Sequence, residues 1–321
     1  MEILKYIGIA IFSLGVSYTV ASVIIPRLKR FGFTGKDMHK PNKPEIAEMG
    51  GISIVAGLTA GVLLAIMIDT FTGVCTFNPL HLLSALTTVY AIAFIGLIDD
   101  LLDIPQWLKA GLPLLASIPL VVVAMGTTTM SIPFIGVIDL GLFYIFVLIP
   151  IGVAVAANLT NMLAGFNGME TGMGIIIFSC MSILALHQGN IEMLALFVPM
   201  LGALLGFIPF NIFPSKAFLG DVGTLTIGAV LATGVIIGNL ETVGALILLL
   251  YVIDFLIKLP NKFPKTFVEL KDEKLYAPKS CPRGLIDVIL KLGRGIKEQH
   301  LVIVMYALQV IVGGIVLMLF W

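Results

Sequence analysis

The sequence predicts an all-α integral membrane protein with ten transmembrane helices, built as a single domain over residues 1–321. Hydrophobic residues make up 59% of the chain and charged residues only 12%, about half the charged fraction of a typical soluble domain. The apolar residues gather in segments long enough to cross a bilayer, and the basic residues gather between alternate segments. These observations exclude a soluble globular fold.

Ten apolar segments carry this prediction. Each approaches the roughly 17–25 residues that a helix needs to cross the hydrocarbon core. The segments cover 3–25, 50–69, 80–98, 109–126, 141–158, 172–187, 191–210, 222–238, 241–258 and 300–320. The first is too long for the apolar core of a signal peptide and is followed by nine others, so we expect it to be a membrane anchor.

The basic residues predict the orientation of these helices. Sorting the connecting segments by parity places 18 of the 19 Lys and Arg residues on one face, with only Lys5 on the other. The positive-inside rule makes that face cytoplasmic, so we expect both termini to lie outside. We therefore expect a multi-pass protein of the cell membrane whose polar motifs face the cytoplasm. The long basic loop 259–299 lies on the same face, and its segment 285–292 has the pattern of a helix lying on the bilayer surface.

The third apolar segment runs into an acidic cluster, Asp99, Asp100 and Asp103. Adjacent carboxylates repel each other and are best tolerated beside a cation. Because no His or Cys lies nearby, an all-oxygen site favours Mg²⁺ or Mn²⁺ over Zn²⁺. The alternative is a solvated cluster that caps the next helix. Lys109 follows at the start of the fourth segment, where it could hold a phosphate or extend to the lipid headgroups.

Asparagine and glycine are concentrated after the fifth apolar segment, between Asn158 and Gly172. Amide side chains such as those of Asn161 and Asn167 can bind a metal through oxygen or read the edge of a base. Glycines such as Gly165 let a ligand approach the backbone closely. The alternative is a helix end and turn, where both residue types are common.

Asp221 stands between two glycines at the start of the eighth segment, where it could bind a metal or only cap the helix. The Lys residues of the first cytoplasmic loop, 37–51, could serve only to set the topology. The basic loop 259–299 could be a substrate lid or a topology signal. The four His residues show no ligand spacing and the three Cys residues are isolated, so the sequence predicts no disulfide framework.

Together, in this order and at these helix ends, the motifs resemble those of the polyprenyl-phosphate N-acetylhexosamine-1-phosphate transferase family. The resemblance spans nearly the whole chain and rests on Asp99-Asp100, the stretch Asn158–Gly172 and Gly220-Asp221. The runs 107–120 and 294–301 are similar to the branch that uses UDP-N-acetylglucosamine and dolichyl phosphate. The last cytoplasmic loop lacks the histidine-rich motif of the bacterial cell-wall branch and the Arg-His-Arg motif of the eukaryotic branch, which suggests an archaeal member.

The resemblance implies transfer of N-acetylglucosamine-1-phosphate, or that of a related sugar, from a UDP-sugar to a polyprenyl or dolichyl phosphate. UMP would be released in this first membrane step of glycan assembly. It implies Mg²⁺, with Mn²⁺ as a substitute, bound by Asn161 and Asp221 beside Asp99 and Asp100. We favour direct attack by the lipid phosphate, which is already anionic near neutral pH; the alternative is a carboxylate nucleophile that forms a phosphoryl-enzyme.

The resemblance also assigns residues to the substrate site. Asp99, Asp100 and Lys109 are the expected catalytic residues, with Lys109 on a phosphate. The residues expected to bind substrate, the first three of them at the uracil base, are Gly165, Asn167, Phe218, Glu48, Lys262, Lys265 and Arg283. The ring of Phe218 would stack on the base, and the prenyl chain would lie in an apolar groove between helices.

The expected partners are the UDP-sugar donor, the lipid phosphate acceptor and the bilayer, with no nucleic acid. A homodimer is compatible with the sequence, although no motif supports it. Two other functions fit parts of the pattern. An intramembrane Mg²⁺-dependent prenyltransferase normally needs two acidic clusters, whereas only 99–103 qualifies here. A secondary transporter places its polar residues near the bilayer midplane, whereas here they collect at one face.

Overall fold

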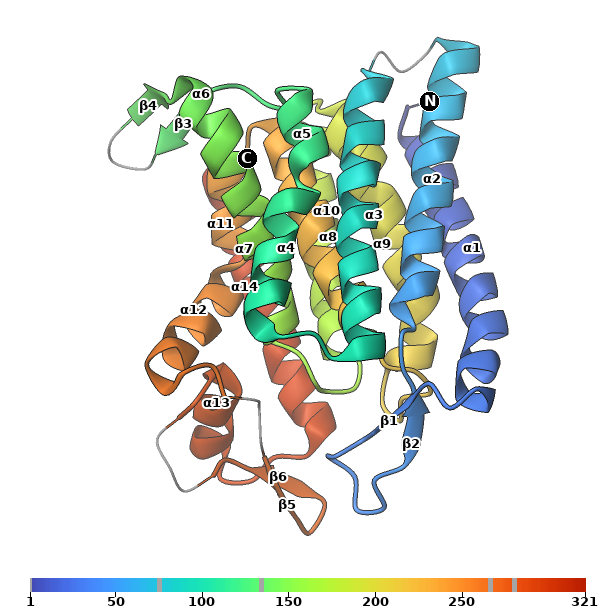
Figure 1. The fold of residues 1–321 in the computed structure, drawn as a ribbon, viewed down its shortest axis with the longest axis vertical. Helices are drawn as coiled ribbons and strands as arrows, with labels where there is room; N and C mark the ends of the chain where they lie inside the picture. Colours follow the sequence, from blue (N-terminus) through green and yellow to red (C-terminus); the bar gives the residue numbers. More distant parts are fainter. Residues whose placement is uncertain (1, 74–76, 133–135, 265–267, 279–281) are drawn as a thin grey trace.

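The fold is a bundle of apolar helices, seen in the computed structural model of the chain (Figure 1). The structure describes residues 2–73, 77–132, 136–264, 268–278 and 282–321. The longer helices are α1 (Glu2–Arg30), α2 (Gly51–Thr72), α3 (Pro79–Leu102), α4 (Gln106–Ala116), α7 (Ile149–Met162), α8 (Met169–His187), α9 (Ile191–Asn211), α10 (Gly220–Gly238) and α14 (Glu298–Phe320). Shorter helical pieces are α5 (Ile118–Val122), α6 (Gly141–Phe143), η1 (Tyr144–Leu148), α11 (Glu241–Ile247), α12 (Leu249–Lys258), η2 (Leu259–Asn261) and α13 (Leu285–Gly293).

Eight helices within the described residues are long and apolar enough to cross a membrane. The pair α11 and α12, bent by 65° at the break between them, makes a ninth crossing if the two are counted as one span. The fourth predicted segment forms the shorter helices α4 and α5, separated at Ser117. Pro113 lies inside α4 and Pro119 in the first turn of α5, and neither supplies a backbone N–H. The all-α polytopic class is therefore confirmed, whereas length and composition support eight or nine crossings.

Three short antiparallel hairpins, which the sequence did not predict, lie at the ends of the bundle. The strand pairs are β1 (Thr34–Lys36) with β2 (Glu45–Ala47), β3 (Thr129–Ile132) with β4 (Gly136–Asp139), and β5 (Glu269–Lys271) with β6 (Lys274–Tyr276). Asp272 and Glu273 join the last pair, both at positive φ, which is the geometry of a tight two-residue hairpin. Strands this short carry too little alternation of apolar and polar residues to be recognised in the sequence.

Helix α10 forms the centre of the bundle. Within its apolar window 89% of the residues are buried, against at most 72% for the other candidate spans of the described chain. It packs against α3, α7, α9 and α2. Gly96 allows α3 to approach closely, because a Cβ at this position would stand 2.6 Å from the backbone of Asp221. This contact places the acidic end of α3 beside the first turn of α10.

The polar connections gather at one end of the bundle (Figure 1). That end holds the hairpins β1–β2 and β5–β6 and helix α13, whereas β3–β4 and both chain termini lie toward the opposite end. The connections also touch one another, since a β-bridge joins Ala47 to Ala217 and Asn167 hydrogen-bonds Asp37. The structure therefore brings the polar motifs to one end of the bundle, away from both termini.

We expect cysteines introduced at Lys43, Lys216 and Lys274 to be labelled from the cytoplasmic side, and a cysteine at Thr128 from the outside. The reason is the concentration of basic residues around the first three positions. The measurement is labelling by a membrane-impermeant maleimide in sealed vesicles, before and after permeabilisation, in a chain without its three native cysteines. Any two of the first three positions on opposite faces would contradict a one-sided site.

Candidate active site

Four helix ends meet around the ammonium group of Lys109. This residue lies near the start of α4 and is only 8% exposed. Its Nζ lies 2.6 Å from Asp99 Oδ2 at the end of α3 and forms an ion pair with Asp221 at the start of α10. Asn161, at the end of α7, contacts both Lys109 and Asp221. We call these four residues the Lys109 group; all of them were predicted site residues, and the structure brings them together.

The amide of Asn161 is oriented by its charged neighbours. The surrounding donors and acceptors assign its orientation: the nitrogen is placed toward Asp221 Oδ1 at 2.9 Å and the oxygen toward Lys109 Nζ at 2.7 Å, so that each donor meets an acceptor. Oxygens of Asp99, Asp221 and Asn161 therefore converge on one cation-binding position, at which the ammonium of Lys109 lies.

Asp100 has a different role, because its carboxylate caps the N-terminus of α10. Its Oδ1 accepts a hydrogen bond from the N–H of Asp221 at 2.8 Å, and its Oδ2 accepts one from the N–H of Val222 at 3.1 Å. These are backbone groups that a helix leaves unpaired at its start. Gly220 has a φ of +70°, and a Cβ there would stand 2.6 Å from Asp100 Oδ2. Asp221 itself does not cap the helix, since its carboxylate is turned toward Lys109.

The predicted acidic cluster thus divides into three environments. Asp99 Oδ1 accepts a hydrogen bond from the N–H of Ile104 at 2.9 Å, while its other oxygen faces Lys109. Asp103 is exposed and ends α3 with a φ of +48°. Only Asp99 and Asp100 reach the buried region, and each of them has both carboxylate oxygens engaged.

The oxygen atoms that surround the Lys109 ammonium fit Mg²⁺. They belong to two carboxylates, Asp99 and Asp221, and to the amide of Asn161, and Mg²⁺ is commonly held by one or two carboxylates together with substrate phosphates. Within the described parts of the chain, no group of three or more His, Cys, Asp or Glu side chains could hold a metal on its own. Asp99 and Asp221 would therefore need the oxygen of Asn161 and oxygens of the substrate to complete a metal site.

A second polar cluster surrounds Asn167, in the loop between α7 and α8. The side-chain nitrogen of Asn167 donates to Asp37 Oδ2 at 3.1 Å, and its backbone N–H donates to Glu298 Oε1 at 2.8 Å. Lys40 bridges the two carboxylates, with 3.3 Å between its Nζ and Asp37 Oδ2 and an ion pair to Glu298. This cluster joins the first loop, the α7–α8 loop and the start of α14.

Aromatic rings lie beside this second cluster. His39 stacks on Phe166 with ring centroids 4.4 Å apart, and Lys40 Nζ stands 4.3 Å over the ring of Phe213. Burial lowers the pKa of His39, so its imidazole is neutral at pH 7. Gly165, next to Phe166, has a φ of +122°, a conformation that favours glycine. Rings of this kind offer stacking surfaces for a base.

Phe218 and Glu48 are held beside strand β2. The N–H of Phe218 donates to the carbonyl of Ala47 at 2.8 Å, and its own carbonyl accepts from the N–H of Gly50 at 2.9 Å. Glu48 is half-buried, and burial raises the pKa of its carboxyl group. The positions of both residues are thus fixed by backbone pairing, while their contacts with substrate stay predictions.

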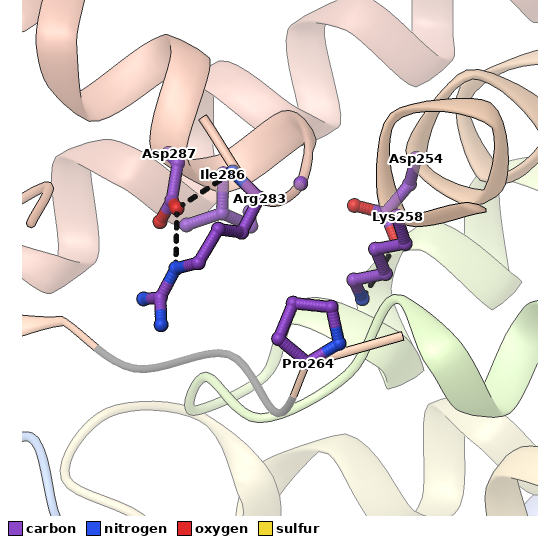
Figure 2. A pocket seen from close by; sticks show the side chains of 7 residues that line it. Asp254, Lys258, Pro264, Arg283, Ile286 and Asp287 are labelled. Atoms are coloured by element: carbon purple, nitrogen blue, oxygen red, sulfur yellow. Dashed lines mark hydrogen bonds and ion pairs between the residues drawn. The ribbon is translucent and has the colours of Figure 1, made fainter. Parts of the chain in front are cut away.

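Two further ion pairs lie at the last basic loop, each between residues four positions apart (Figure 2). Asp254 and Lys258, near the end of α12, form a buried pair at 2.7 Å, and Lys258 also donates to the carbonyl of Met162 at the end of α7. Arg283 pairs with Asp287 at 3.4 Å. Figure 2 shows Arg283 and Lys258 on opposite sides of a hollow of about 10 Å³. This volume holds about one water molecule and is too small for a sugar.

The other predicted residues of this loop have different surroundings. Lys262 is exposed, directly after η2, and Lys265 lies outside the described residues. The helix α13 lies where the sequence predicts a surface helix, and it packs against α12. Its buried residues include Ile286 and Leu290, whereas Leu292 is 80% exposed.

An apolar cavity of about 280 Å³ runs along α7, walled by α10, α11 and α12. At one end lies Leu159, two residues before Asn161; at the other lies Tyr144, which hydrogen-bonds Glu241. The stretch of helix between Tyr144 and Leu159 is about 20 Å long. Leu248, at the bend between α11 and α12, is part of the wall. The cavity therefore begins within one turn of the Lys109 group.

Comparison with known proteins identifies the family. The pattern of glycosyl transferase family 4 matches residues 82–239. A Saccharolobus solfataricus protein, proposed to be a UDP-N-acetylglucosamine–dolichyl-phosphate N-acetylglucosaminephosphotransferase, is 36% identical over 99% of this chain and 98% of its own length. The chain belongs to glycosyl transferase family 4. A Sulfolobus acidocaldarius protein with the same proposed name is 34% identical over 90% of this chain and 88% of its own. A phospho-N-acetylmuramoyl-pentapeptide-transferase of Clostridium perfringens is 31% identical over 80% of this chain and 83% of its own length.

The family pattern covers residues 82–239, and this segment contains the whole Lys109 group and Asn167. Three polar partners of the second cluster lie outside it, namely Asp37, Lys40 and Glu298. Sequence reasoning missed them because a loop lysine is typical of a topology determinant and an acidic residue at a helix start is typical of a dipole contact. Only the fold shows that they meet at Asn167.

Proposed function

We propose that this chain transfers N-acetylglucosamine-1-phosphate from UDP-N-acetylglucosamine to dolichyl phosphate or a related polyprenyl phosphate, with release of UMP. The observation that carries the proposal is an oxygen-rich group around the buried Lys109, within one helical turn of the end of an apolar cavity. This arrangement suits a reaction between a water-soluble donor and a lipid phosphate. The names of the archaeal relatives support the same reaction. We assign the site to the cytoplasmic face of the cell membrane, where glycan assembly would begin.

The donor nucleotide would lie over the second cluster. Asn167 and Gly165 would contact the uracil, and Phe218 would stack on it; stacking of this kind contributes about 1–3 kcal/mol per base. Lys109 would hold a phosphate of the donor. The remaining proposed contacts with the sugar and pyrophosphate are Glu48, Lys262, Lys265 and Arg283.

Mg²⁺, or Mn²⁺ in its place, would be held by Asn161 and Asp221 with Asp99 beside them. When bound, it would neutralise charge on the pyrophosphate and act as a Lewis acid. Asp100 would keep Asp221 in position, because its carboxylate fixes the first backbone N–H groups of α10. Lys109 would add a second positive charge that Asp99 already orients.

We favour direct attack by the lipid phosphate on the sugar-bearing phosphorus. The second pKa of such a phosphate monoester is about 6, so the group is mostly dianionic near neutral pH and needs no general base. One oxygen of the lipid phosphate forms a new bond to the sugar-bearing phosphorus. The bond between that phosphorus and the UMP oxygen breaks, and its electrons leave with UMP. Asp99 and Asp100 are engaged at both oxygens, which favours positioning over nucleophilic attack.

The prenyl chain of the acceptor would lie in the apolar cavity along α7, because its exposure to water would be unfavourable. Its phosphate would then emerge beside Leu159 and reach the Lys109 group. Gly152, in the wall of the cavity, leaves room for the chain, since no atom lies within 4 Å of a Cβ built there.

An assay that follows three products separates this function from its alternatives. The purified protein in detergent, with Mg²⁺, a panel of UDP-sugars and either dolichyl or undecaprenyl phosphate, should release UMP only when the lipid phosphate is present. Prenyl transfer from a prenyl diphosphate, or solute uptake by vesicles, in the absence of UMP release would favour a prenyltransferase or a transporter. The polar motifs meet at one end of the bundle, through contacts such as those of Asp37 with Asn167 and of Lys109 with Asp99, which argues against a transporter.

A further inference from the structure

We propose that Asp37 fixes the orientation of the Asn167 amide and so makes the nucleotide site select uracil over cytosine. The inference rests on the proposed function, in which Asn167 contacts the base of the donor. It assigns a positioning role, for base specificity, to a residue of the first loop that lies far from Asn167 in the sequence.

The carboxylate of Asp37 is buried and fully engaged. Asp37 is 3% exposed and Asn167 is 4% exposed. Asp37 Oδ1 accepts the backbone N–H of His39 at 3.2 Å, while Oδ2 accepts the side-chain nitrogen of Asn167 at 3.1 Å and lies 3.3 Å from Lys40 Nζ. An ionised carboxylate can only accept hydrogen bonds, so the NH₂ group of Asn167 must face Asp37 and its carbonyl must face away.

The backbone of Asn167 is fixed as well as its side chain. Its N–H donates to Glu298 Oε1 at 2.8 Å. Lys40 forms ion pairs with both Glu298 and Asp37, so one cation holds together the two carboxylates that bind Asn167. The amide can neither move with the loop nor rotate by 180° without leaving a buried donor or carboxylate unpaired, which is costly.

A fixed amide distinguishes the two pyrimidines by their edges. Uracil presents an N3–H donor beside a carbonyl acceptor at position 4, whereas cytosine presents an acceptor at N3 beside an amino donor. The carbonyl of Asn167 can accept the N3–H of uracil while its second N–H donates to the position 4 oxygen. Cytosine would oppose donor to donor and acceptor to acceptor. A freely rotating amide would fit either base by turning over.

Competition by UMP and CMP tests the inference. Transfer from UDP-N-acetylglucosamine is measured in membranes containing the wild type, Asp37→Asn, Asp37→Ser or the control Glu45→Gln, which changes an exposed carboxylate of the same loop. Asparagine and serine can donate as well as accept, so neither variant dictates the orientation of Asn167. The ratio of the CMP to the UMP inhibition constant does not depend on how much of a variant is folded.

We expect the wild type to bind UMP more tightly than CMP by roughly 5- to 150-fold, the discrimination of a two-bond amide contact. Both Asp37 variants should move the ratio toward one, and Glu45→Gln should keep the wild-type ratio. Equal weakening of UMP and CMP, an unchanged ratio, or complete loss of transfer in both Asp37 variants would overturn the inference while leaving the proposed function intact. Absence of transfer by the wild type would refute the proposed function itself.

Discussion

The substitution Asp221→Asn should lower the rate of UMP release by at least about 100-fold while the protein stays folded. Asp221 brings a carboxylate to the oxygen cluster that would bind Mg²⁺ and forms an ion pair with Lys109. Losing several kcal/mol of transition-state stabilisation corresponds to a loss of this size, since each 1.36 kcal/mol is tenfold. The measurement is the initial rate of UMP release in detergent over a range of Mg²⁺ concentrations, together with thermal unfolding of the same samples.

Asp103→Asn is the matched control, because it makes the same change in the exposed member of the acidic cluster. Asp103 has a φ of +48°, a conformation that asparagine also tolerates. The control should retain wild-type activity. If Asp221→Asn kept more than about a tenth of the activity, a contribution below about 1.4 kcal/mol, the residue would not be a metal ligand.

The substitution Gly152→Leu should block the acceptor while sparing the donor site. A leucine side chain at this position would project from α7 into the apolar cavity without meeting another atom near its Cβ. Adding side-chain atoms to a filled apolar site costs about 1–3 kcal/mol. If binding of the prenyl chain loses this much free energy, kcat/KM for a long polyprenyl phosphate should fall roughly 5- to 150-fold. Inhibition by UMP should be unchanged, since the Asn167 cluster is not altered.

Gly314→Leu provides the control for a new leucine on a membrane helix. Gly314 lies in α14, is exposed and has no atom within 4 Å of a built Cβ, but it does not line the cavity. This variant should use long acceptors like the wild type. Equal acceptor kinetics in the two variants would place the prenyl chain elsewhere on the bundle.

The helices could be predicted from the sequence because burial in lipid demands long apolar segments. The break in the fourth segment at Ser117 was not predicted, since prolines such as Pro113 and Pro119 are tolerated in membrane helices. The three hairpins were also missed, because three or four residues show no clear period. Length patterns therefore predicted the architecture, while the count of ten crossings stays a prediction.

The Lys109 group was predicted only through the resemblance to a family. From the residues alone, metal binding by Asp221 and capping of α10 were equal alternatives. The structure removes the second, because Asp100 supplies the cap from another helix, and metal binding stays a prediction. A contact between residues 100 and 221 has no local signal in the sequence. The same holds for Asp37 and Glu298, which meet at Asn167 only after the bundle forms.

Tracing the sugar-bearing phosphate gives the most direct test of the central claim, transfer of a sugar-1-phosphate. The purified protein is supplied with UDP-N-acetylglucosamine labelled with ³²P at the β-phosphate, together with Mg²⁺ and dolichyl phosphate, and the lipid and aqueous products are separated. We predict that the label enters the lipid product while unlabelled UMP appears in equal amount. Label recovered in the aqueous phase as UDP, with the sugar alone attached to the lipid, would contradict the account.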